Sequence, residues 1–109
     1  MRRLSLVALF FALLTAGCGG GGASQADRDK AVTEAMDAYD AAKTADVDFA
    51  RGPCIAERLP GLDDWVADVA HDPRTSVDDQ PQNQCSRYRA GEAHHFVELD
   101  PAGQLIRAE

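Results

Sequence analysis

The three histidines are the side chains of this chain best suited to hold a metal ion. His94 and His95 are adjacent, and His71 directly precedes Asp72. Adjacent residues of a strand point to opposite faces, so His94 and His95 cannot readily share one ion. Either of them together with His71, and with Asp72 or Asp68 nearby, would offer the nitrogen and oxygen ligands that zinc accepts. The spacing matches no metal motif, so ordinary structural histidines are the favoured interpretation and metal binding the alternative.

The cluster Ser86-Arg87-Tyr88-Arg89 is basic in an otherwise acidic chain. Arg87 and Arg89 have the forked donors that clamp a carboxylate, a phosphate or an acidic glycan. The favoured alternative is a strand whose arginines pair with neighbouring Asp and Glu residues.

The polar segment that begins at Asp72 and ends at Arg89 contains this cluster. Its periodicity is poor, and Pro73 and Pro81 interrupt it, so the sequence predicts a loop of about 18 residues that Cys85 pins near its end. Loops of this length in a small domain are often functional. A plain disulfide-tethered connection is the favoured interpretation, and a ligand-binding loop is the alternative.

Motifs for other chemistries are missing from the sequence. Asp78-Asp79 lacks the EF-hand calcium spacing, and Ser76 and Ser86 lack the G-x-S-x-G elbow of a serine nucleophile. The sequence contains neither a P-loop nor a dinucleotide fingerprint. We therefore expect no enzymatic activity and no cofactor.

Residues 1–18 read MRRLSLVALFFALLTAGC and have the layout of an export signal. Arg2 and Arg3 precede an apolar run of 11 residues, from Leu4 to Leu14. That run is too short to span a bilayer, which takes about 20 residues, but it has the length of a signal-peptide core. The small residues that follow it suit peptidase cleavage.

The sequence Leu14-Thr15-Ala16-Gly17-Cys18 resembles the lipobox of bacterial lipoproteins, with Thr15 at the position where leucine is usual. The resemblance implies cleavage after Gly17 and acyl chains on Cys18. Residues 1–17 would then be the signal peptide, 18–24 an acylated cysteine with a glycine-rich tether, and 25–109 a single small globular domain. The alternatives are a plain secretory signal that carries a cysteine and a buried N-terminal helix.

As a lipoprotein, the protein would be anchored to the bacterial cell membrane or outer membrane through the acyl chains on Cys18, facing the extracytoplasmic side. Two or three acyl chains give stable anchoring, whereas one is marginal. Loss of the signal peptide leaves 9 basic and 18 acidic residues, a formal charge of −9. So acidic a chain repels nucleic acid, and we expect none as a partner.

Cys54 and Cys85 are an even pair once Cys18 carries lipid. An exported domain of this size has a thin core that often needs a covalent staple. We therefore predict a Cys54–Cys85 disulfide. Two free thiols or two metal ligands are the alternatives, although no CxxC spacing supports zinc.

The remaining pattern predicts an α+β fold. Residues from Ser24 to about Ala45 have a helical apolar stripe, and the stretch from Trp65 to His71 alternates as a strand does. Residues 93–99 and 104–108 flank Asp100-Pro101-Ala102-Gly103, a type I turn signature that predicts a β-hairpin. We expect the amphipathic N-terminal helix to pack on an antiparallel β-sheet of three to four strands, stapled by the disulfide, with Trp65 in the core.

These observations favour a small lipid-anchored, non-enzymatic protein of the cell envelope that acts as a structural or interaction module with an envelope protein partner. The first alternative is a ligand-binding or inhibitory module that uses the segment from Asp72 to Arg89. The second is a metal-binding protein that uses His71 with His94 or His95.

Overall fold

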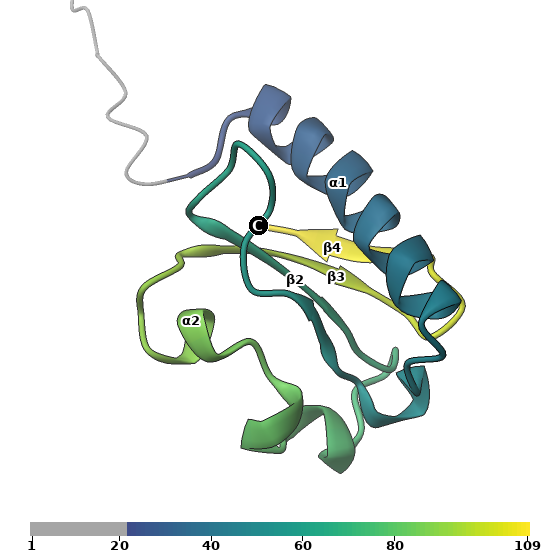
Figure 1. The fold of residues 1–109 in the computed structure, drawn as a ribbon. Coiled ribbons are helices and arrows are strands. Elements are labelled where there is room, and N and C mark those ends of the chain that lie inside the picture. The colour runs from purple at the N-terminus through teal and green to yellow at the C-terminus, as the bar shows by residue number, and fades with distance from the viewer. Residues whose placement is uncertain (1–21) are drawn as a thin grey trace, which may run out of the picture.

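A long helix, α1, spans Gln25–Thr44 and crosses one face of a four-stranded sheet (Figure 1). The computed structural model describes residues 22–109. The predicted signal peptide and the predicted lipidation residue Cys18 lie outside the described residues. Among the residues described, no helix combines the length and the apolar composition needed to cross a bilayer.

The start of α1 follows from its capping residue. The Ser24 hydroxyl accepts a hydrogen bond from the backbone N–H of Asp27 at 3.1 Å, which satisfies one of the free donors of the first turn. The buried face of the helix consists of Ala31, Ala35 and Tyr39. Two alanines on that face let the helix backbone lie close to the sheet. The predicted helix and its packing on the sheet are confirmed.

The sheet is mixed. The strand order is β1–β2–β3–β4; β1 pairs with β2 and β3 with β4 antiparallel, whereas β2 and β3 are parallel. The four strands are β1 (Cys54–Ala56), β2 (Trp65–Val69), β3 (His95–Leu99) and β4 (Leu105–Ala108). The fold class and the four strands agree with the prediction, but an antiparallel sheet throughout does not. A parallel pair needs a long connection between its strands, and the segment after β2 supplies one.

The predicted C-terminal hairpin is confirmed, and Asp100 organises its turn. The carboxylate Oδ1 of Asp100 accepts hydrogen bonds from the N–H groups of Ala102 at 2.9 Å and Gln104 at 2.8 Å. Gly103 has a φ of +85° and lies against the ring of Tyr39, so glycine suits the position both in conformation and in space. The Tyr39 hydroxyl donates to the carbonyl oxygen of Pro101 at 2.8 Å, which ties α1 to this turn.

The two faces of the sheet follow the alternation of the strands. Trp65, only 2% exposed, points toward α1 with the other members of the main core, as predicted. On the opposite face Val66 and Phe96 pack with Cys85 and Ala93, which belong to the connection between β2 and β3. We call that connection, residues 70–94, the crossover segment.

The crossover segment is not the structureless loop that its composition predicts. It contains two 3-10 helices, η2 (Ser76–Asp79) and η3 (Pro81–Asn83), and the short helix α2 (Ser86–Arg89). The strand considered for the basic cluster is therefore also wrong. Short helical turns satisfy backbone groups locally, which a segment packed on a sheet requires.

The disulfide joins Cys54 of β1 to Cys85 at the start of α2, as predicted, with a sequence separation of 31. It tethers the crossover segment to an edge strand of the sheet. Such a bond is typical of a protein that folds in an oxidising, extracytoplasmic compartment.

Candidate functional site

A cavity of about 450 Å³ lies between the sheet and the crossover segment. This volume lies in the range of small-molecule sites. We call it the crossover cavity. Its walls come from the sheet face that α1 does not cover and from the crossover segment. The lining residues are Val66, Asp68, Arg74, Asp79, Gln84, Cys85, Tyr88, Arg89, Phe96, Glu98 and Arg107.

Two carboxylates from neighbouring strands enter this cavity. In the parallel register of β2 and β3, Asp68 is the direct partner of Glu98. Both alternate with apolar residues that face α1, so both side chains lie on the cavity face of the sheet. Two like charges at such neighbouring positions repel each other unless cations compensate them.

Glu98 has two such cations, although it is only 3% exposed. Its Oε1 accepts a hydrogen bond from Arg74 Nη1 at 2.7 Å, and its Oε2 accepts one from Arg107 Nε at 3.3 Å. Arg74 reaches it from the crossover segment and Arg107 from β4. Arg74 also donates to Asp79 Oδ1, from Nε at 3.2 Å and from Nη2 at 3.1 Å, and its Nη2 donates to the Asp78 carbonyl oxygen at 3.3 Å.

Asp68 has no comparable partner. Its Oδ1 is buried and makes no hydrogen bond within residues 22–109. Burial, followed by repulsion from the Glu98 carboxylate, raises the pKa of Asp68 to about 7, although Arg74 and Arg107 oppose the shift. The cavity therefore contains a carboxyl group that changes charge near neutral pH. One of its oxygen atoms, Oδ1, accepts no hydrogen bond from residues 22–109.

The outer part of the cavity is aromatic and basic. Tyr88 meets Phe96 edge-on, with ring centroids 5.3 Å apart. The guanidinium of Arg107 lies over the same Phe96 ring, 5.2 Å from its centroid. Arg89 lines the cavity, and its guanidinium group makes neither a hydrogen bond nor an ion pair with any residue of the described range. It is thus available to a ligand.

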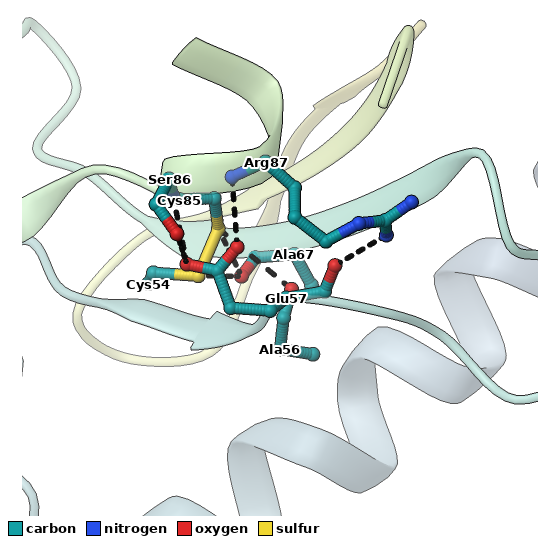
Figure 2. Close-up of a disulfide and its surroundings, with 7 residues drawn as sticks. All are labelled: Cys54, Ala56, Glu57, Ala67, Cys85, Ser86 and Arg87. Atoms are coloured by element: carbon teal, nitrogen blue, oxygen red, sulfur yellow. Dashed lines mark hydrogen bonds between the residues drawn. A yellow bond between two sulfur atoms is a disulfide. The ribbon is translucent and has the colours of Figure 1, made fainter. Parts of the chain in front are cut away.

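Arg87, the other arginine singled out by the sequence, is used within the protein (Figure 2). Its guanidinium donates to the carbonyl oxygen of Glu57 at 2.7 Å and to that of Asp63 at 2.8 Å. In return, the Glu57 carboxylate caps the start of α2 and accepts the N–H groups of Ser86 at 2.7 Å and Arg87 at 3.0 Å. Burial opposes ionisation of Glu57, but these backbone hydrogen bonds outweigh it and lower its pKa. Arg87 therefore positions α2 beside the disulfide.

His71 holds the first part of the crossover segment through Asp78. Asp78 is 2% exposed and accepts hydrogen bonds from His71 Nδ1 at 2.9 Å, from His71 N at 3.1 Å and from Thr75 N at 2.8 Å. Burial alone would raise the pKa of Asp78, but these hydrogen bonds lower it overall. Asp78 is thus a buried anchor of the crossover segment.

His94 and His95 both lie beside the carboxylate of Asp64, whereas His71 lies beside that of Asp78. His94 Nδ1 lies 2.7 Å from Asp64 Oδ1, and His95 Nε2 lies 3.5 Å from Asp64 Oδ2. The hydrogen bond from His94 is the main reason that the pKa of Asp64 is lowered. His95 pairs with the first residue of β2, whereas His71 lies two residues beyond the last, about 20 Å along the chain direction. The structure does not bring His71 together with His94 or His95.

Within residues 22–109, one group of side chains has its potential metal-ligand atoms close together. It consists of Cys54, Glu57 and Cys85, whose ligand atoms lie within 4.8 Å of one another. Both sulfurs are joined in the disulfide, so neither is a thiolate. The Cys85 sulfur lies 3.3 Å from the Ala67 carbonyl oxygen, in a contact without a donor hydrogen. The cluster therefore serves as a staple.

Sequence reasoning missed the pairing of Asp68 with Glu98. A signal was present, because each is a lone acid between apolar residues of a strand: Asp68 between Ala67 and Val69, and Glu98 between Val97 and Leu99. An acid on an alternating strand usually faces solvent. The pattern alone therefore does not show whether such an acid lies in a cavity or on an exposed face of the sheet.

The chain matches no known protein family model, no curated protein and no solved structure.

Proposed function

We propose that this protein is a lipid-anchored module of the bacterial envelope that binds a small polar ligand in the crossover cavity. The observation that carries the proposal is the buried Oδ1 of Asp68, which lines a ligand-sized cavity without a hydrogen-bond partner among the described residues. A buried polar atom without a partner costs about 1–3 kcal/mol. A ligand that donates a hydrogen bond there would remove that cost.

The anchor is supported by the lipobox-like sequence that ends at Cys18. The Cys54–Cys85 disulfide fits an exported chain. The acidic mature chain would be repelled by an anionic membrane surface, so we propose that acyl chains on Cys18 do the anchoring.

Binding is favoured over catalysis by the state of Glu98. Glu98 is enclosed by Arg74 and Arg107, so it is poorly placed to attack a substrate or to activate a water molecule. Among the functions that the sequence leaves open, a ligand-binding module that uses the segment from Asp72 to Arg89 is therefore the one we propose. That segment supplies half of the cavity wall.

Native mass spectrometry of the full chain, expressed with its signal and extracted in mild detergent, tests both parts of the proposal. We expect the mass of residues 18–109 plus acyl chains and an added noncovalent mass of the size of a small molecule. Asp68→Asn should lose the noncovalent mass, whereas Asp37→Asn, an exposed acid on α1, should retain it.

Cys18→Ser should lose the acyl mass and leave the membrane fraction. An unacylated wild-type chain would overturn the anchor. A ligand mass absent from the wild type, or equally present in Asp68→Asn, would overturn the binding site. A bound mass of protein size would instead favour an interaction module.

A further inference from the structure

We infer that the ligand is a small zwitterion with an apolar side chain, an α-amino acid for which leucine serves as the probe, whose ammonium group binds Asp68 and whose carboxylate binds Arg89. The inference rests on the proposed function and adds the chemical class of the ligand. It depends on which charged groups of the crossover cavity are already paired and which are not.

The cavity has an unmatched acid. Of the two adjacent carboxylates, Glu98 takes both nearby guanidinium groups, at 2.7 Å from Arg74 and 3.3 Å from Arg107. Asp68 has a buried oxygen with no donor from residues 22–109. A buried carboxylate is stable only when it is paired, so an incoming ammonium group would supply the missing partner.

The cavity also has an unmatched base. Arg74 is held by Glu98 and Asp79, and Arg107 by Glu98 and the face of Phe96. Arg89 lines the same cavity without a partner among the residues described. A guanidinium group recognises a carboxylate through two parallel hydrogen bonds, so Arg89 suits the other end of a zwitterion.

Part of the surface around these two groups is apolar. Val66, Tyr88 and Phe96 contribute aliphatic and aromatic surface to the wall. This surface favours a ligand with an apolar side chain over a sugar or a dianion. One free acid and one free base also disfavour a ligand with a single sign of charge, because one of the two groups would remain unmatched.

The binding of an ammonium group to Asp68 depends on pH, since it requires the ionised carboxylate. The charged groups that face Asp68 are Glu98 from β3, Arg107 from β4, and Arg74 and Asp78 from the crossover segment. With a pKa of about 7, the ionised fraction of Asp68 rises about tenfold from pH 6 to pH 8. The affinity for a zwitterion should rise by the same factor.

Three probes of one shape separate the two charges. Leucine has both groups, 3-methylbutylamine lacks the carboxylate, and 4-methylpentanoate lacks the ammonium group. Isothermal titration calorimetry of each probe against the acylated protein in detergent micelles gives three dissociation constants. We expect leucine to bind at least tenfold more tightly than either analogue.

Two variants assign the ends of the ligand. Arg89→Gln should weaken leucine to the level of the amine and leave the amine unchanged. Asp68→Asn should weaken leucine to the level of 4-methylpentanoate and remove the pH dependence. Arg51→Gln, whose side chain is 75% exposed, is the matched control and should leave all three constants unchanged.

Equal binding of leucine and the amine, with no effect of Arg89→Gln, would overturn the zwitterion in favour of a simple cation. Failure of all three probes would overturn this inference alone if native mass spectrometry still detects a ligand that Asp68→Asn loses. Failure of all three probes together with an empty wild-type cavity would overturn the proposed function as well.

Discussion

Asp68 and Glu98 are direct partners across the parallel strands β2 and β3, yet only Glu98 is paired with guanidinium groups. Because only one of them is paired, the two acids of this cavity have different roles. Glu98 joins β3 to the crossover segment and to β4 through its arginines. Asp68 remains a buried acid that titrates near neutral pH, and such groups cluster at functional sites.

Ionisation of Asp68 should destabilise the fold as the pH rises. Its pKa is about 7 in the folded protein and 3.8 in the reference state, so the folded state holds more protons between pH 4 and pH 7. The free energy of unfolding should therefore fall across that window, by roughly 3–4 kcal/mol for this group. Urea unfolding at pH 5 and pH 8 samples most of this change, and the free energy of unfolding should fall by roughly 2–3 kcal/mol between them.

Asp68→Asn should remove most of this pH dependence and be the more stable protein at pH 8. The acids Glu57, Asp64 and Asp78 have lowered pKa values, so their contributions are lost only as the pH falls below about 5, outside the compared range of pH 5 to pH 8. Asp37→Asn should unfold like the wild type at both pH values. A wild-type free energy of unfolding that rises from pH 5 to pH 8 would show that the pKa of Asp68 is not raised in the folded protein.

Gly52 should tolerate alanine much less well than Gly91. Both have positive φ, +63° and +74°, so alanine at Gly91 should cost about 1 kcal/mol through conformation alone. A Cβ at Gly52 would also collide with the Asp78 carboxylate, which holds the crossover segment. We expect Gly52→Ala to cost roughly 3 kcal/mol or more. Thermal and urea unfolding compare the two variants, and equal losses would mean that Asp78 moves away at little cost.

Loss of the disulfide should destabilise the protein by about 3–4 kcal/mol, because the bond closes a loop over a separation of 31 residues. The double variant Cys54→Ala, Cys85→Ala should unfold at lower urea concentration than the oxidised wild type. A reductant should lower the stability of the wild type toward that of the variant. The variant itself should not respond to the reductant, and a response would point to an effect unrelated to this bond.

Arg87 and Arg89 should behave differently although they are two residues apart. Arg87→Ala removes hydrogen bonds to the carbonyl oxygens of Glu57 and Asp63 and should cost about 1–2 kcal/mol of stability. Arg89→Ala removes no side-chain hydrogen bond or ion pair within the described chain and should change stability by about 0.5 kcal/mol or less.

Leucine binding provides the second measurement on this pair. Arg89→Ala should weaken it at least tenfold, whereas folded Arg87→Ala should retain at least part of it. A large loss of stability in Arg89→Ala would show that Arg89 is a structural residue instead.

The sequence by itself determined the parts of this protein that depend on neighbours along the chain. The Ser24 cap and the helical stripe predict α1, and the Asp100 to Gly103 turn predicts the β3–β4 hairpin, because capping, turn chemistry and alternation act over a few residues. The Cys54–Cys85 bond was predictable because these two residues are the only cysteines downstream of Cys18.

Only the tertiary structure decided the parallel pairing of β2 with β3, and with it the site. The crossover segment has no strong periodicity, so its helical turns and the face that it covers depend on packing against Val66 and Phe96. The parallel register then brings Asp68 beside Glu98 from 30 residues away. A strand pattern shows which face a residue lies on, but it contains no information about which residue of another strand will lie beside it.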